Sequence, residues 1–249
     1  IHSCLLLLEK EKGYNLSKTT VGLVGVGHVG HAVIEAIRPL GVQILLNDPP
    51  QKEALRKAGK PHEFFLKMEE LQEKCDIISF HTPLITKGPY PTFHLANKTF
   101  FNALKKQPII INTSRGAVVD NTDVLQALKD GIIRDAIIDT WENEPNINQE
   151  LLNLIYIGTP HIAGYSADGK ANATRMALTA LCNHFHLPVT FQIRVPQLPE
   201  EELPEPNLTE TERALVLYNP HTDSLKLKSH PTMFEELRGN YPLRREFIE

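Results

Sequence analysis

The chain alternates short apolar runs with amphipathic stretches, and this alternation predicts its fold. The apolar runs are rich in Ile, Val and Leu and nearly continuous, which is typical of strands buried on both faces of a parallel sheet. These runs lie at residues 20–24, 42–46, 76–80, 108–112, 136–139 and 155–158. Segments that predict helices lie at 2–12, 31–38, 68–74, 99–105, 121–129 and 166–187. We therefore predict the α/β class, with a Rossmann-type doubly wound parallel sheet.

The pattern changes after residue 187. Residues 188–206 include the proline-rich, acidic stretch from Val195 to Pro206, which predicts a linker. Residues 207–249 carry weaker signals, with a strand expected at 213–218 and a turn at Asn219-Pro220. Because so few large apolar residues would give a marginal core alone, we expect this segment to dock on something else, such as a second copy of the chain.

Composition excludes several classes of protein. The 249 residues carry a net charge of −4, whereas a free-standing nucleic-acid binder normally has a basic excess. The apolar run near the start, Cys4–Leu8, is too short for a membrane span or a signal-peptide core. Cys4, Cys75 and Cys182 are far apart and lack CxxC spacing, so we expect neither a disulfide framework nor structural zinc, and the cytoplasm is the default location.

A glycine-rich turn predicts a dinucleotide site. Gly25, Gly27 and Gly30 form a GxGxxG pattern between a predicted strand and helix, and Asp48 ends the next strand eighteen residues after Gly30. The helix N-terminus would offer free N–H groups to a pyrophosphate, and a carboxylate at position 48 favours NAD over NADP. The alternative is a turn that binds nothing. His28 and His31 have metal-ligand spacing, but no third ligand is near, so we expect solvent-facing side chains and no metal.

Three later strand ends each carry a chemically useful side chain, namely Arg115, Glu144 and His161. A guanidinium can grip a carboxylate, an imidazole can take a hydroxyl proton, and a neighbouring carboxylate can orient that imidazole. Beside a nicotinamide, this set predicts oxidation of a 2-hydroxy acid or the reverse reduction. Individually, each residue could instead be a surface charge, a structural histidine or part of an acidic loop, and Glu142 competes with Glu144.

The motifs around these residues resemble those of the D-isomer-specific 2-hydroxyacid dehydrogenases, whose signature places Arg, Glu and His in this order. Glu144 follows Arg115 by 29 residues and His161 follows it by 46, and the resemblance covers about residues 1–190. It implies that Arg115 and Glu144 are catalytic, that His161 is the proton donor/acceptor and that Arg115 and Tyr165 contact the substrate. Glu144 precedes a proline, as in the family, and is therefore preferred to Glu142. The further residues implied to line the NAD site are His28, Val29, Asp48, Thr82, Thr113, Ser114, Asp139 and Gly164.

Several segments resemble one group within the family, which oxidises a phosphorylated four-carbon 2-hydroxy acid on the route to pyridoxal 5′-phosphate. They are 47–50, 81–84, 87–90, 114–121 and 159–166, and 240–247 resembles the C-terminal dimerisation region of that group. The resemblance therefore implies a small C-terminal α+β dimerisation segment and a homodimer. Two other hypotheses stay open: a sister enzyme for 3-phosphoglycerate or a simple 2-hydroxy acid, and a non-catalytic NAD-binding corepressor.

These observations predict three parts of the chain. Residues 1–187 form an NAD-binding domain with flanking crossover helices, 188–206 a linker and 207–249 part of a dimerisation region. Family members usually carry an N-terminal substrate domain, and this chain starts, at Ile1, with the helix before the dinucleotide strand. We therefore expect most of that domain to be missing, together with its contacts to the substrate phosphate, as in a piece of a longer dehydrogenase.

Overall fold

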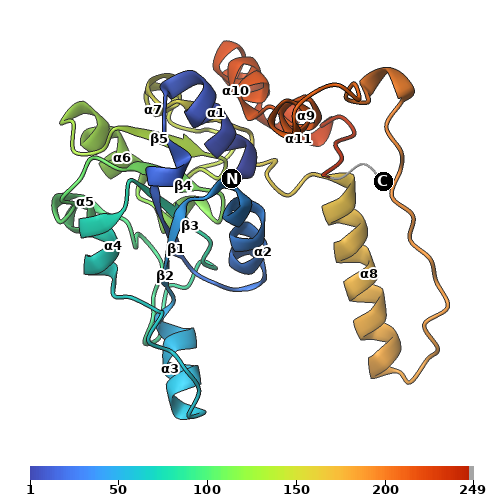
Figure 1. The fold of residues 1–249 in the computed structure, drawn as a ribbon, viewed down its shortest axis with the longest axis horizontal. Coiled ribbons are helices and arrows are strands. Elements are labelled where there is room, and N and C mark those ends of the chain that lie inside the picture. The colour runs from blue at the N-terminus through green and yellow to red at the C-terminus, as the bar shows by residue number, and fades with distance from the viewer. Residues whose placement is uncertain (247–249) are drawn as a thin grey trace.

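A computed structural model of the chain describes residues 1–246 and contains a six-stranded parallel sheet (Figure 1). The strands are β1 (Thr20–Val24), β2 (Gln43–Asn47), β3 (Ile77–Phe80), β4 (Ile109–Asn112), β5 (Asp135–Ile138) and β6 (Ile157–Gly158). They lie in the order β2-β1-β3-β4-β5-β6. The direction of winding thus reverses between β1 and β3, and the crevice at such a reversal is where sheets of this type bind ligands.

Helices cover both faces of the sheet because alternate strand residues enter two separate hydrophobic clusters. Ile78 and Ile110 belong to one cluster, and Ile77 and Ile109 belong to the other. The first face is covered by α4 (Met68–Lys74), α5 (Lys98–Asn102), α6 (Asn121–Lys129) and α7 (Gln149–Leu154), and the second by α1 (His2–Lys12) and α2 (His28–Ile37). The predicted doubly wound α/β sheet is confirmed.

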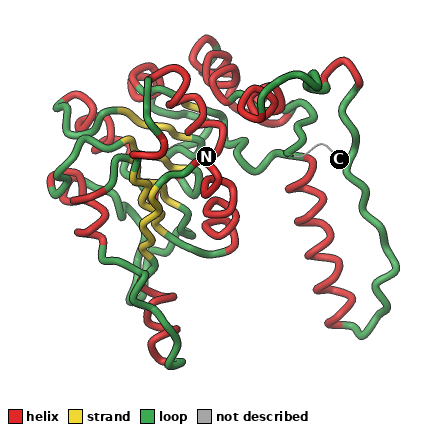
Figure 2. The backbone as a smooth tube through the Cα atoms, viewed as in Figure 1, coloured by secondary structure: helices red, strands yellow, loops and turns green. Residues whose placement is uncertain are grey.

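Two helices have little contact with these layers. α3 (Pro49–Lys57) follows the edge strand β2 and buries none of its residues. α8 (Ala167–His184) projects from the domain, and a loop runs back along it (Figures 1 and 2). Only Ala171 of α8 is buried, while Met176 is 63% exposed. The expected helix over 166–187 is therefore present but ends at His184, and it lies apart from the sheet.

The C-terminal segment corrects one prediction. The strand expected at 213–218 is wrong, because α9 (Glu210–Leu217) occupies this stretch and begins with a capping box between Thr209 and Glu212. It is followed by α10 (Pro220–Ser229) and α11 (Phe234–Gly239), so within residues 207–246 the structure is helical rather than α+β. The last three residues of the expected dimerisation region, 247–249, lie outside the described part.

The same segment packs on the sheet of its own chain. Leu227 of α10 and Phe234 of α11 are fully buried in the first hydrophobic cluster. Ser224 Oγ accepts a hydrogen bond of 2.9 Å from the backbone N–H of Gly158, which ties α10 to the edge strand β6. The expectation that this segment docks on something else thus holds, but its observed partner is the sheet domain of the same chain.

Two features of residues 1–246 bear on the function classes. None of the helices found there has both the length and the apolar character that crossing a membrane requires. In the same range, no group of three or more His, Cys, Asp or Glu side chains is arranged to hold a metal ion.

Candidate active site

The turn between β1 and α2 has the shape that a dinucleotide needs. Gly25 has a φ of +90°, and a Cβ on it would lie 2.8 Å from the carbonyl oxygen of His81. A Cβ on Gly30 would lie 2.4 Å from the carbonyl oxygen of Gly25, so helix and turn touch there. A Cβ on Gly27, in contrast, would meet nothing within 4 Å. The first and third glycines are therefore required by packing, and the second leaves open space at the N-terminus of α2, where an anion is favoured.

Asp48 lies beside this turn at the end of β2. Its Oδ2 accepts a hydrogen bond of 2.8 Å from the backbone N–H of Val26, and its Oδ1 caps α3 by accepting one of 2.9 Å from the N–H of Gln51. On the next strand end, Thr82 Oγ1 is buried and has no partner among the described residues. The open glycine turn suits a pyrophosphate, and the carboxylate beside it suits a ribose, so the edge of the sheet here can accept a dinucleotide.

His28 and Val29 begin α2 and are exposed, and His31 is exposed as well. His31 Nδ1 lies 2.9 Å from the carbonyl oxygen of Gly27. The prediction of solvent-facing histidines on this helix is confirmed.

Asp139 organises the loop that carries His161. Its carboxylate accepts hydrogen bonds from Thr159 Oγ1 at 2.7 Å, Ile162 N at 2.8 Å and Ala163 N at 3.0 Å. Burial raises the pKa of Asp139 even though these hydrogen bonds and the nearby His161 act to lower it. The backbone N–H of His161 also donates to the carbonyl oxygen of Asp139, at 2.8 Å. Asp139 thus fixes the position of His161, while Gly164 beyond it has open space around its Cα.

Glu144 and His161 form the central pair of the site. His161 Nδ1 lies 2.8 Å from Glu144 Oε2, and Glu144 Oε1 accepts a hydrogen bond of 2.8 Å from the backbone N–H of Trp141. Burial acts to raise the pKa of Glu144, but the hydrogen bonds from His161 and Trp141 and the charges of His161 and Arg238 outweigh it, so the pKa is lowered. The carboxylate therefore stays ionised and holds the ring by its Nδ1–H.

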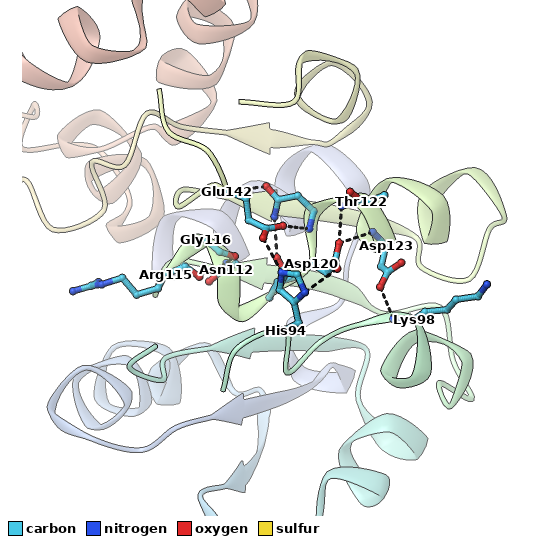
Figure 3. A network of polar contacts seen from close by, with 11 residues as sticks. His94, Lys98, Asn112, Arg115, Gly116, Asp120, Thr122, Asp123 and Glu142 are labelled. Atoms are coloured by element: carbon cyan, nitrogen blue, oxygen red, sulfur yellow. Dashed lines mark hydrogen bonds and ion pairs between the residues drawn. The ribbon is translucent and has the colours of Figure 1, made fainter. Parts of the chain in front are cut away.

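Arg115 faces the same cavity from the loop after β4. The cavity has a volume of about 330 Å³ and is lined by Leu84, Arg115, Gly116, Ala117, Trp141, Glu142, Asn143, Glu144 and His161. Arg115 is exposed, and its Nη1 donates a hydrogen bond of 2.7 Å to the carbonyl oxygen of Ser114. In Figure 3 its guanidinium points away from the polar network behind it. The predicted trio therefore lines one cavity.

Glu142, the competitor of Glu144, has other partners. Its Oε1 lies 2.7 Å from His94 Nε2, and its Oε2 accepts a hydrogen bond of 2.9 Å from the backbone N–H of Asn121 (Figure 3). Glu144, and not Glu142, is the carboxylate that contacts His161. The preference for Glu144 over Glu142, which rests on the proline that follows Glu144, agrees with this geometry.

Tyr165 belongs to a cluster that the sequence did not indicate. Lys170 Nζ lies 4.4 Å from the centre of its ring, and the guanidinium carbon of Arg238 lies 5.8 Å from the same centre. Tyr241 packs edge-on against Tyr165 at 6.1 Å. Arg238 Nε is buried and has no partner within residues 1–246. Since α11 is distant in sequence from the trio, no sequence motif pointed to Arg238 as part of the site.

Thr113 and Ser114 directly precede Arg115 in the loop that follows β4. Asn112 shapes this loop, because its side chain accepts a hydrogen bond from the Ser114 hydroxyl at 2.9 Å and donates one of 3.0 Å to the carbonyl oxygen of Arg115. Gly116 follows, and a Cβ on it would lie only 1.9 Å from the carbonyl oxygen of Trp141. The Arg115 loop and the Glu144 loop are therefore in direct backbone contact, which only glycine permits here.

Comparison with known proteins gives one family. The family model described as the NAD-binding domain of D-isomer-specific 2-hydroxyacid dehydrogenases matches residues 8–163. The erythronate-4-phosphate dehydrogenase of Bacteroides fragilis is 50% identical over 246 residues, which are 99% of this chain and 69% of that protein. The enzyme of the same name from Escherichia coli O157:H7 is 38% identical over 99% of this chain and 66% of that protein.

Solved structures give the same result for the fold. The apo D-mandelate dehydrogenase of Rhodotorula graminis superposes with a TM-score of 0.58 at 26% identity, over 78% of this chain and 57% of that one. The D-lactate dehydrogenase of Aquifex aeolicus, solved with NAD and lactic acid, gives a TM-score of 0.55 at 26% identity over 70% of this chain and 55% of that one.

Proposed function

Because the chain belongs to the D-isomer-specific 2-hydroxyacid dehydrogenases, an oxidoreductase family with an NAD-binding domain, we propose that it oxidises 4-phospho-D-erythronate. The product is (R)-3-hydroxy-2-oxo-4-phosphooxybutanoate, on the route to pyridoxal 5′-phosphate. The observation that carries the proposal is the Glu144–His161 contact of 2.8 Å in the cavity that Arg115 also lines. The name of the relatives that match nearly the whole chain supports the substrate.

His161 is the base. Its Nδ1 donates to Glu144, so in the neutral ring Nε2 is unprotonated and can accept the hydroxyl proton of the substrate. NAD, which the glycine turn and Asp48 would hold, would supply the acceptor for the hydride from C2 of the substrate. The C2–O bond becomes a carbonyl as the proton passes to His161 Nε2, so charge and atoms balance.

Glu144 stabilises the charge that His161 gains. Its carboxylate is fixed by the backbone N–H of Trp141, and its pKa is lowered by the hydrogen bonds and charges around it, which outweigh its burial. A fixed anion at Nδ1 favours the imidazolium and keeps the ring in one orientation. The pair thus both holds the tautomer and supports proton transfer.

Arg115 binds the substrate carboxylate. Its Nη1 donates a hydrogen bond to the carbonyl oxygen of Ser114. A guanidinium has further N–H donors, and these can bind a ligand in the cavity. A guanidinium and a carboxylate can pair through two parallel hydrogen bonds, which fixes C2 of the substrate relative to His161.

The second anion of the substrate, its phosphate, needs cations of its own. Lys170 and Arg238 both lie over the Tyr165 ring, and the charge of Arg238 acts on the pKa of Glu144, so it lies within electrostatic reach of the catalytic pair. The buried, unpartnered Nε of Arg238 in the described chain is a donor that an anion could satisfy. We assign the phosphate end of the substrate to these two side chains.

The substrate assignment is tested by initial rates of NADH formation. We expect a higher kcat/KM for 4-phospho-D-erythronate than for 3-phosphoglycerate or D-lactate. A preference for 3-phosphoglycerate would assign the protein to a sister enzyme, and a preference for D-lactate would also contradict the phosphate site. Absence of NADH formation with all three, despite NAD binding, would favour a non-catalytic NAD-binding protein.

We also propose that the protein is a cytoplasmic homodimer that pairs through its C-terminal segment. Val216 of α9 and Leu225 of α10 are 54% and 55% exposed on helices that are anchored to the domain by other residues. Exposed apolar side chains on a fixed helical surface are typical of an interface. The three cysteines are free, which agrees with a reducing compartment.

A further inference from the structure

His94 lies between two carboxylates that belong to different loops of the site. It precedes α5 in the chain, and its φ is +47°. Its Nδ1 lies 3.0 Å from Asp120 Oδ2, and its Nε2 lies 2.7 Å from Glu142 Oε1 (Figure 3). The ring stacks on that of Phe93, with the two centres 4.0 Å apart.

Each carboxylate is itself fixed to backbone near a catalytic residue. Asp120 follows Arg115 by five residues and caps α6 by accepting hydrogen bonds from Thr122 N at 2.9 Å and Asp123 N at 3.1 Å. Glu142 precedes Glu144 by two residues and accepts a hydrogen bond from the N–H of Asn121. One imidazole ring therefore joins the segment that follows Arg115 to the segment that carries Glu144.

The backbone of His94 strengthens this junction. Its N–H donates a hydrogen bond of 2.7 Å to the carbonyl oxygen of Ala117, two residues after Arg115. The N–H of Glu142 donates in turn to Asn121 Oδ1 at 3.1 Å. Together with the Gly116–Trp141 contact, these bonds set the separation between the Arg115 and Glu144 loops.

The geometry requires a charged ring. A carboxylate only accepts hydrogen bonds, and a neutral imidazole has one N–H, so only the imidazolium can donate to Asp120 and Glu142 together. The side chains of His94, Asp120 and Glu142 are 28%, 19% and 21% exposed, so water screens the three charges only in part. The charged groups that contact the ring are Asp120, from the segment before α6, and Glu142, from the loop after β5. Neighbouring Asp123 is bonded to the N–H of Lys98.

We propose that the His94 cation is a positioning residue that holds Arg115 and Glu144 in register for hydride transfer. Among the described residues its ring pairs with Asp120 and Glu142, and not with Glu144 or His161. Without a cation at position 94, one of the two carboxylates loses its donor, and the two anions repel each other. The Arg115 and Glu144 loops then separate, so the Arg115 guanidinium and the His161 base are no longer aligned on the substrate.

A spectroscopic measurement tests the charge without any substitution and without turnover. In the protein labelled with ¹⁵N-histidine, the His94 ring nitrogens, assigned by their loss in His94→Gln, should both show attached protons at neutral pH. A neutral His94 ring at neutral pH would overturn the proposal. This measurement does not depend on the proposed dehydrogenase activity, so it separates failure of this inference from failure of that function.

Kinetics test the positioning role, which rests on the proposed activity. We expect His94→Gln to lower kcat by about tenfold, with the KM for NAD changed less than about twofold. His94→Arg keeps a cation with several donors, so it should recover most of kcat.

A matched control is His230→Gln, because His230 is an exposed histidine outside the site. Circular dichroism and thermal unfolding establish that each variant is folded. A His94→Gln protein that is folded and retains the wild-type kcat would overturn the proposal, as would a His94→Arg protein no more active than His94→Gln.

Discussion

Glu144 Oε2 lies 2.8 Å from His161 Nδ1, although 17 residues separate the two positions in the chain. The contact forms because β5 and β6 are neighbouring parallel strands, so the loops that follow them leave the same edge of the sheet. Trp141 joins the loops a second time, since its indole N–H donates a hydrogen bond of 2.9 Å to the carbonyl oxygen of Thr159. The pair is thus held from both sides before any ligand binds.

Two glycine substitutions separate fold from cofactor binding. Gly30→Ala places a methyl group against the carbonyl of Gly25 and should lower the free energy of unfolding by about 2 kcal/mol. Gly27→Ala meets no protein atom within 4 Å, so it should leave stability unchanged and weaken NAD binding by about tenfold or more. Urea unfolding and titration with NAD measure the two effects. Wild-type NAD affinity in Gly27→Ala would contradict the placement of the pyrophosphate.

The phosphate site predicts a substrate-dependent loss. Arg238→Gln and Lys170→Gln should each lower kcat/KM for 4-phospho-D-erythronate by about 10–100-fold, because each removes a charged hydrogen-bond donor. The value for unphosphorylated D-erythronate should fall much less, and in Arg238→Gln only because the charge that acts on Glu144 is lost. Arg213→Gln, at an exposed position of α9, is the matched control. Equal losses with both substrates would show that Arg238 and Lys170 do not contact the phosphate.

Acid should destabilise the protein through His81. Burial lowers the pKa of this histidine from 6.5 to about 3, and its Nε2 lies 3.0 Å from Ser79 Oγ. As the pH falls below about 6.5, the unfolded chain therefore binds a proton at His81 that the folded chain does not bind. The free energy of unfolding should fall by about 2 kcal/mol from this group as the pH is lowered from about 7.5 to 5. His81→Gln should show a shallower slope in urea unfolding over this range than wild type or His230→Gln. Parallel slopes would mean that His81 is charged in the folded state.

Charge on the exposed face of the C-terminal helices should break the proposed dimer. The double variant Val216→Glu and Leu225→Glu should run as a monomer in light scattering, because two carboxylates would be buried on each side of the interface. Deleting the whole segment is a poorer test, since it would expose the core around Leu227 and Phe234. Phe64→Glu, at a position 52% exposed between α3 and α4, should leave the mass unchanged. A double variant with the wild-type mass would contradict the proposed surface.

The sheet was predictable from the sequence because local composition decides it. In a near-continuous apolar run such as Ile109–Ile111, successive side chains point to opposite faces of the strand, so they all leave water only if both faces are buried. All six predicted strands are present, with bounds that differ by at most a few residues. The glycine turn and the trio follow strands, so their common edge follows from parallel topology. The helix after Asp48 was not predicted, although Asp48 as N-cap and Pro49 in the first turn are helix-start signals.

The rest depended on contacts between distant segments. The stretch 213–218 is locally compatible with a strand, but the Thr209–Glu212 capping box and docking on the domain select a helix. Arg238 reaches Tyr165 only because Phe234 anchors α11 in the core. His94 is separated from Glu142 by 48 residues, and no sequence pattern places both beside Asp120. Tertiary packing, which no local pattern records, brings these groups together.

The most direct test of the account is the turnover of His161→Ala and Glu144→Gln with 4-phospho-D-erythronate and NAD. His161→Ala should lower kcat by about 1,000-fold, because it removes the base, and Glu144→Gln should lower it by about 100-fold, because the ring loses its anion. NAD affinity, measured by titration, should be unchanged in both variants. A His161→Ala enzyme that turns over within about tenfold of wild type would contradict the assignment of His161 as the base, and with it the central claim.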